Sequence, residues 1–74
     1  MVNIRDRLTL RSYRITAGIK AEEIAAAAGV TVDTVYKWEK GRSFPNAPQI
    51  VRILDLFASR GYVINIGDIN FFSQ

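Results

Sequence analysis

The sequence contains neither cysteine nor histidine in its 74 residues. It can therefore form no disulfide, and it offers neither a thiolate nor an imidazole to a metal ion or to a Cys/His or Ser/His/Asp catalytic arrangement. Its seven acidic residues show no calcium-loop spacing. These absences exclude a disulfide-stapled scaffold, and we expect no enzymatic activity, no metal and no cofactor.

Long apolar runs are absent as well. The longest run, Ile24 to Val30, is far shorter than the roughly 18 residues of a membrane span, and the charged Arg5-Asp6-Arg7 stands where a secretory signal would be apolar. We therefore expect a cytoplasmic protein that makes no contact with a membrane. A chain of this length has room for one small domain, and we place residues 1–74 in it.

Positive charge is only slightly in excess, and the formal net charge is +3. The first 14 residues carry this excess, because they contain four arginines and a single acidic residue, Asp6. A modest basic excess of this kind is compatible with a nucleic-acid partner but does not identify one.

Glycine occurs at an ordinary frequency, and its positions divide the chain into helices. Four of the five glycines follow stretches with helical periodicity, where a residue that readily adopts positive φ ends a helix at little cost. We predict helices over Asn3–Ala17, over Ala21–Ala28, from the N-cap Thr31 to about Lys40, and from the N-cap Asn46 to just before Gly61. The core stripe of the last helix is Ile50, Ile53, Leu54 and Phe57.

The segment after Gly61 is ambiguous. Residues 62–66 have the composition of a short strand, whereas Asn65 and Asp68 resemble a helix cap followed by a last helical turn to Phe72. We favour the helical turn and keep the strand as the alternative.

A combination of residues in the middle of the chain indicates a known family. It comprises Leu10-Arg11, Tyr13-Arg14, Gly18-Ile19, Glu22-Glu23-Ile24-Ala25, Gly29-Val30-Thr31 and Val35-Tyr36-Lys37-Trp38-Glu39-Lys40-Gly41. Over about residues 8–60 the chain resembles the lambda-repressor-like (XRE/Cro) helix-turn-helix DNA-binding family. The resemblance implies an all-α bundle of four to five helices, with the helix-turn-helix at the second and third helices and residues 32–40 as the recognition helix in the major groove.

Residues 44–50 are most similar to small phage-type regulators, which implies a bacterial or phage-infected cell. Two residues depart from the family pattern. Lys20 stands where the family usually has a Ser or Thr N-cap, and Ala21 stands where it has a phosphate-contacting Gln. We therefore expect the second helix to be anchored to the DNA backbone differently, through the ammonium of Lys20.

The expected recognition helix has one face for the core and one for DNA. At about 100° per residue, Val35 and Trp38 share the inner face, and Lys37 lies on the outer one. An ammonium can bond guanine O6 and N7, and the family has a base-contacting residue at this position, so Lys37 is the first candidate for base readout. The alternative is that Asp33 and Lys37 form an ordinary surface ion pair.

Three further residues of this helix are candidates for base readout. Asp33 could accept from cytosine N4 or reject wrong sequences through its charge, and Val32 could meet a thymine methyl group. Tyr36 flanks the outer face, where it could reach a phosphate or stack on a sugar, or could simply be a surface tyrosine.

Polar residues around the recognition helix are candidates for contacts with the DNA backbone, although each could equally be an ordinary solvated side chain. They are Lys20, Thr31, Thr34, Lys40, Arg42, Ser43 and Asn46. Glu39 differs from them, because it points toward the core side and a charge there needs a partner. Arg14 occupies the family position that commonly pairs with it, so the resemblance implies a structural Arg14–Glu39 ion pair.

We expect a sequence-specific regulator that binds double-stranded DNA, Cro-like or a small repressor. The alternatives are a protein-interaction module such as an anti-repressor, which the apolar tail of residues 62–72 favours, and the DNA-binding antitoxin of a toxin–antitoxin pair. We further expect a homodimer on a palindromic operator, with contacts through Ile69, Phe71 and Phe72. These apolar residues could instead fold back onto the first and fourth helices.

Overall fold

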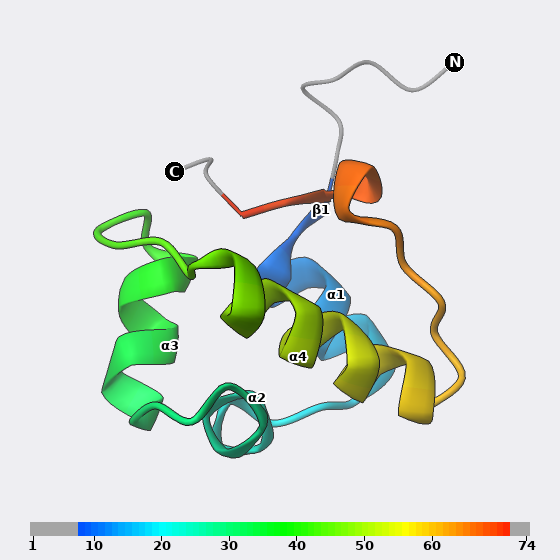
Figure 1. Cartoon of the computed structure of the whole chain (residues 1–74), viewed down its shortest axis with the longest axis horizontal. Helices are drawn as coiled ribbons and strands as arrows, with labels where there is room; N and C mark the ends of the chain where they lie inside the picture. The colour runs from blue at the N-terminus through cyan, green and yellow to red at the C-terminus, as the bar shows by residue number, and fades with distance from the viewer. Residues whose placement is uncertain (1–7, 72–74) are drawn as a thin grey trace.

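A computed structural model of the protein describes residues 8–71. Within this range the chain forms four α-helices, a short 3₁₀ helix and two short strands (Figure 1). The helices are α1 (Leu10–Ala17), α2 (Ala21–Ala28), α3 (Val32–Glu39) and α4 (Ala47–Ser59), and the remaining elements are β1 (Leu8–Thr9), η2 (Ile66–Asp68) and β2 (Ile69–Asn70). The fold is therefore of the predicted all-α class, with one added strand pair.

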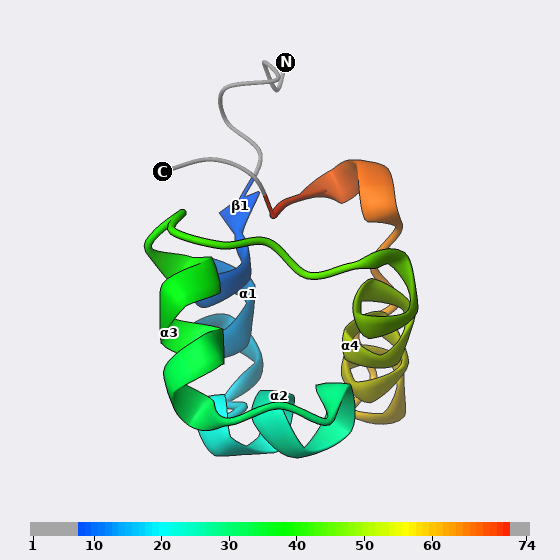
Figure 2. The same cartoon turned by 60° about the vertical axis from the view of Figure 1, so that its left-hand side comes forward.

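The helices enclose a single core. Figure 2 shows α2 lying between α3 and α4, and α2 contacts both of them. The most deeply buried side chains come from these three helices, with Ile24, Val35, Ile53 and Phe57 all fully withdrawn from solvent. The predicted stripe of α4 accordingly faces inward, with Ile50 also buried and Leu54 partly buried.

Local capping signals mark the end of α2 and the start of α4. Gly29 adopts positive φ, +74°, directly after α2. The backbone N–H of Gln49 donates to Oδ1 of Asn46 at 2.9 Å, and Oε1 of Gln49 accepts from the N–H of Asn46 at 2.8 Å. This reciprocal pair satisfies two N–H groups at the start of α4, which fixes the first residue of the helix. The observed bounds of α2, α3 and α4 match the predicted ones to within one or two residues.

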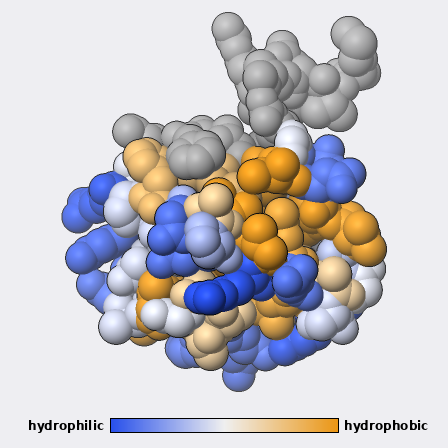
Figure 3. Space-filling model, viewed as in Figure 1, coloured by the Kyte–Doolittle hydropathy of each residue, from blue (hydrophilic) through white to orange (hydrophobic). Residues whose placement is uncertain are grey.

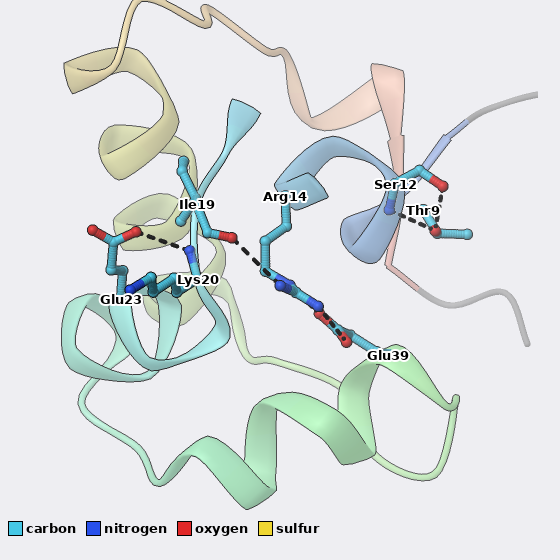
Figure 4. Close-up of polar contacts among 7 residues, drawn as sticks. All are labelled: Thr9, Ser12, Arg14, Ile19, Lys20, Glu23 and Glu39. Atoms are coloured by element: carbon cyan, nitrogen blue, oxygen red, sulfur yellow. Dashed lines mark hydrogen bonds and ion pairs between the residues drawn. The ribbon is translucent and has the colours of Figure 1, made fainter. Parts of the chain in front are cut away.

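The start of α1 differs from the prediction. The helix was expected to begin at Asn3, but Leu8 and Thr9 are extended and the helix begins at Leu10. Thr9 is the N-cap, because its Oγ1 accepts from the backbone N–H of Ser12 at 3.3 Å (Figure 4). The first part of the predicted helix, residues 3–7, lies outside the described residues.

The C-terminal segment differs from both structures considered for it, because residues 62–66 form no strand and the helical turn does not extend to Phe72. A helical turn follows Asn65 as predicted, and the Asp68 carboxylate accepts from the N–H of Asn65 at 3.3 Å, but this turn is a 3₁₀ helix that ends at Asp68. Ile69 and Asn70 then form β2, which pairs in parallel with β1. Residues two apart in an extended segment face the same side, so Ile69 and Phe71 can both enter the core. A longer helix would have separated them.

This arrangement also corrects the expected dimer contact. Ile69 and Phe71 are each only 3% exposed, because they complete the core of the single chain. Their side chains are thus not on the surface where a second copy could meet them, whereas Phe72 lies outside the described residues. Tyr13 of α1 contacts the same segment, because its hydroxyl donates to the carbonyl of Asp68 at 3.1 Å. The ring of Tyr13 also packs edge-on against Phe57 of α4.

Candidate nucleic-acid interface

A tight turn connects α2 to α3. Gly29 ends α2, and the N–H of Val30 donates back to the carbonyl of Ala25 at 3.0 Å. Thr31 then caps α3, because its Oγ1 accepts from the N–H of Thr34 at 3.3 Å. The two helices are packed against each other, and this contact decides which face of α3 is left for solvent.

The inner face of α3 is fixed in the core. Val35 is fully buried and Trp38 is only 4% exposed, as the helical spacing predicted. Val32, which was predicted to meet a base, is half-buried and packs against the same core. It therefore offers DNA only part of its side chain.

The outer face of α3 presents three of the four predicted base-reading residues. Asp33, Tyr36 and Lys37 are all exposed. The Lys37 ammonium lies 3.8 Å from a carboxylate oxygen of Asp33. The ion pair considered as an alternative is thus present, on a face that solvent and a ligand can both reach.

The predicted backbone contacts at the start of α3 are engaged in capping. The hydroxyls of Thr31 and Thr34 lie 3.0 Å apart and share a hydrogen bond. Thr31 is exposed and Thr34 is half-buried. A phosphate would meet these hydroxyls at the N-terminus of a helix, where backbone N–H groups favour an anion.

The loop from α3 to α4 carries four more of the predicted backbone contacts. Lys40 and Arg42 are exposed, on either side of Gly41, whose φ is +73°. Asn46 is exposed as well, although its side-chain oxygen is held by the cap of α4. Ser43 differs from the others, because its hydroxyl oxygen is buried and makes no hydrogen bond within the described part of the chain. It would have to turn outward to contact a phosphate.

An ion pair fixes α3 against α1. The Arg14 Nε donates to the Glu39 Oε2 at 2.7 Å and its Nη2 donates to Oε1 at 3.2 Å, while Nη1 reaches the carbonyl of Ile19 at 3.4 Å (Figure 4). The side chains are 14% and 5% exposed. The hydrogen bond to Glu39 raises the pKa of Arg14, so the guanidinium keeps its charge. This is the pair that the family resemblance implied.

A second ion pair was not anticipated from the sequence. The Arg60 Nη2 lies 2.6 Å from the Glu23 Oε1, and the other carboxylate oxygen of Glu23 accepts from the N–H of Lys20 at 2.9 Å. Both contacts lower the pKa of Glu23, the Arg60 hydrogen bond most. Arg60 is 37 residues away in sequence, so no local pattern links the two residues.

The same contacts show how α2 begins without the usual cap. Lys20 has no side-chain hydrogen bond at the N-cap, and the carboxylate of Glu23 instead accepts from the backbone N–H of Lys20. Lys20 is exposed, whereas Ala21 is 2% exposed. Ala21 is buried and has no polar group, so it cannot replace the phosphate-contacting Gln that the resemblance implied at this position, whereas Lys20 presents a cation to solvent.

Two helices joined by a tight turn, with the second held in place by its inner face, are typical of one DNA-binding motif. A family model for the helix-turn-helix domain matches residues 7–60. The chain belongs to this family. In the helix-turn-helix domain α2 and α3 form the motif, and the family binds DNA and is typically not enzymatic.

Other comparisons and searches add little to the family assignment. No curated protein and no solved structure matches this helix-turn-helix domain. Within residues 8–71, no helix combines the length and the apolar character needed to cross a membrane. The same residues contain no cluster of acidic side chains placed to hold a metal ion.

Proposed function

We propose that the protein is a sequence-specific transcriptional regulator of the Cro-like or small phage-type repressor kind, with α3 lying in the major groove of double-stranded DNA. The observation that carries this proposal is the division of α3 into two faces. Val35 and Trp38 anchor it in the core, and Glu39 is tied to Arg14. A rigidly held helix with a polar outer face suits base recognition, because readout needs side chains at fixed positions.

Base readout is assigned to the middle of this face. The ammonium of Lys37 can donate to O6 and N7 of a guanine, a contact worth about 1–3 kcal/mol of discrimination against another base. Tyr36, one residue before it, is 42% exposed and is proposed to contact the neighbouring sugar or phosphate. Val32 contributes through its exposed part alone.

Contacts with the DNA backbone are assigned to cations at the two ends of the motif. Lys20 lies at the start of α2, and Lys40 and Arg42 follow α3. Because phosphates line both edges of the major groove, cations on both sides of a recognition helix can fix its register without reading sequence.

We further propose that two copies bind a palindromic site. One recognition helix reads only a few base pairs, and two copies related by a two-fold axis place their helices about 34–36 Å apart, in successive turns of the major groove. Figure 3 shows apolar surface over the face that carries α4 and the segment leading to η2. Val63 in that segment is 85% exposed and Ile66, the first residue of η2, is 59% exposed, and we assign the contact between the copies to them.

The same exposed side chains favour a second candidate function. If Val63 and Ile66 contact a different protein, the chain is an interaction module such as an anti-repressor that retains the fold of a regulator. Exposed apolar side chains are a mark of a protein-contact surface where they form a patch.

Selection of duplexes from a random DNA library distinguishes the two candidates. The regulator is expected to enrich a palindromic consensus, and Lys37→Ala is expected to lose preference at one base-pair position of each half-site with a smaller loss on random DNA. Failure of the unmodified chain to enrich any sequence would contradict the regulator and favour the interaction module.

A further inference from the structure

The outer face of α3 carries two opposite charges that cancel. α3 contains three charged side chains, and one of them, Glu39, is turned inward to Arg14. The other two are Asp33 and Lys37, one helical turn apart, with 3.8 Å between their charged groups. The recognition helix therefore offers DNA no net charge of its own, and the cations outside the helix must supply the attraction to phosphates.

The Asp33–Lys37 pair is poorly explained as a stabilising contact. The side chains are 79% and 56% exposed, and an ion pair in such a solvated position contributes little to stability. The helix dipole also favours each charge where it stands, because Asp33 lies in the first turn of α3 and Lys37 in the last. Neither charge therefore needs the other to be stabilised. The Asp33–Lys37 ion pair is thus easily separated. DNA can therefore replace it with contacts of its own to the two side chains.

The carboxylate of Asp33 has few favourable partners on DNA. Phosphates repel it, and the acceptor atoms of guanine and thymine offer it no hydrogen. Two bases present an amino donor in the major groove, cytosine at N4 and adenine at N6, and cytosine N4 is the usual donor to an aspartate because adenine places its N7 acceptor beside the amino group. Asp33 is therefore satisfied at a site with a correctly placed cytosine and is left without a partner at most other sites once Lys37 moves away.

We propose that Asp33 is a specificity-determining residue that restrains Lys37. On random DNA its carboxylate holds the ammonium and opposes the approach of phosphates. At the operator, Lys37 moves to a guanine while a cytosine amino group replaces it beside Asp33. Four residues of helix rise about 6 Å and base pairs are about 3.4 Å apart, so the guanine and the cytosine lie within about two base-pair steps. This inference rests on the proposed function, because it places α3 in the major groove.

The test compares Asp33→Asn with Asp55→Asn. Both variants remove one exposed carboxylate and change the net charge equally, but Asp55 lies on α4, outside the proposed interface. For each variant and the unmodified chain, affinity is measured on the selected duplex and on a random duplex over a range of salt concentrations. Circular dichroism checks that all three proteins are folded.

Asp33→Asn is expected to bind random DNA more tightly than Asp55→Asn does. Its salt dependence on random DNA should steepen by up to about 0.9 in log–log slope, because Lys37 is freed to contact one phosphate. Its preference for cytosine at one position of each half-site should fall by about 5- to 150-fold. Equal behaviour of the two variants would overturn the inference and leave Asp33 as a solvated surface residue.

A second comparison shows whether Asp33 acts through Lys37. In a Lys37→Met background, Asp33→Asn is expected to produce no steeper salt dependence on random DNA, because the cation that it would release is missing. The same steepening with and without Lys37 would overturn the restraint.

The results of these experiments also distinguish a failure of this inference from a failure of the proposed DNA-binding function. If the unmodified chain selects a site and Lys37→Ala relaxes it while Asp33→Asn changes nothing, the inference fails alone. If the unmodified chain shows no sequence preference, both fail.

Discussion

The guanidinium of Arg14 and the carboxylate of Glu39 meet through two hydrogen bonds, of 2.7 and 3.2 Å, that join α1 to the last residue of α3. Neither group has much access to water. Because the carboxylate holds one end of α3 and Val35 and Trp38 hold its inner face, the helix cannot roll without breaking an ion pair or exposing the core. The orientation of Lys37 and Asp33 toward solvent follows from these constraints.

Replacing Glu39 with Gln is therefore expected to destabilise the fold. The substitution keeps the size of the side chain but leaves the Arg14 charge without its counterion, and leaving a partly buried group unpaired in this way costs about 1–3 kcal/mol. Urea denaturation measures the free energy of unfolding. In a double-mutant cycle with Arg14→Met, the two changes should be strongly non-additive. Additive effects would show that the two side chains do not depend on each other.

The Glu23–Arg60 pair predicts a dependence of stability on pH. The pKa of Glu23 lies below its ordinary value of 4.5 in the folded chain, so the folded state binds fewer protons there than the unfolded state. The contribution of Glu23 to stability is thus fully present above about pH 4.5 and is lost as the pH falls through the folded pKa. The free energy of unfolding measured between pH 2 and 7 should fall less steeply at the acidic end for Glu23→Gln than for the unmodified chain.

Glu22→Gln provides the matched control for this experiment. Glu22 is the neighbouring carboxylate and is exposed, and the same substitution changes the net charge equally. It should leave the acidic part of the profile close to that of the unmodified chain. A profile for Glu23→Gln that coincides with that of Glu22→Gln would show that the contact with Arg60 has no effect on stability.

The sequence was sufficient to predict the bounds of α2, α3 and α4, because the signals that mark them are local, whereas the helix-turn-helix itself was implied by the family resemblance. Thr31 and Asn46 cap helices with their own side chains, and Gly29 ends α2 with a positive φ. The apolar spacing of α4 likewise gave Ile53 and Phe57 as core residues. Each of these features depends on residues within one or two turns of one another.

The elements that were missed depend on contacts between distant residues. The strand Leu8–Thr9 forms by pairing with Ile69–Asn70. No residue pattern near Thr9 predicts this strand. The link between Glu23 and Arg60 is equally non-local. The Arg14–Glu39 pair is non-local too. It was predicted because the family resemblance implied Arg14 as the partner of Glu39, whereas the spacing of the residues alone does not identify that partner.

Arg42 is expected to contribute to DNA affinity through charge alone. If its guanidinium contacts a phosphate, Arg42→Ala should reduce the salt dependence of binding by about 0.9 in log–log slope, equally on selected and random duplexes. Fluorescence anisotropy at several salt concentrations measures this slope. Arg11→Ala removes an exposed arginine from α1, which the proposed interface does not use, and should leave the slope unchanged. Equal slopes for the two variants would remove Arg42 from the interface.

The C-terminal segment contains both core and surface residues, and this distinction can be measured. Phe71 is 3% exposed, so Phe71→Ala should cost about 3–5 kcal/mol through the cavity that it leaves. Val63 and Ile66 are exposed, so changing both to Ser should alter the free energy of unfolding by no more than about 1 kcal/mol.

The Val63→Ser/Ile66→Ser protein then tests the contact between two copies. Because its fold is preserved, any loss of association reflects the surface and not the core. Sedimentation of the protein with a palindromic duplex is expected to give two copies per duplex for the unmodified chain and mostly one for the variant, with a lower Hill slope of binding. Two copies per duplex and equal Hill slopes for both proteins would contradict the proposed contact, and the apolar surface would then be assigned to a different protein partner.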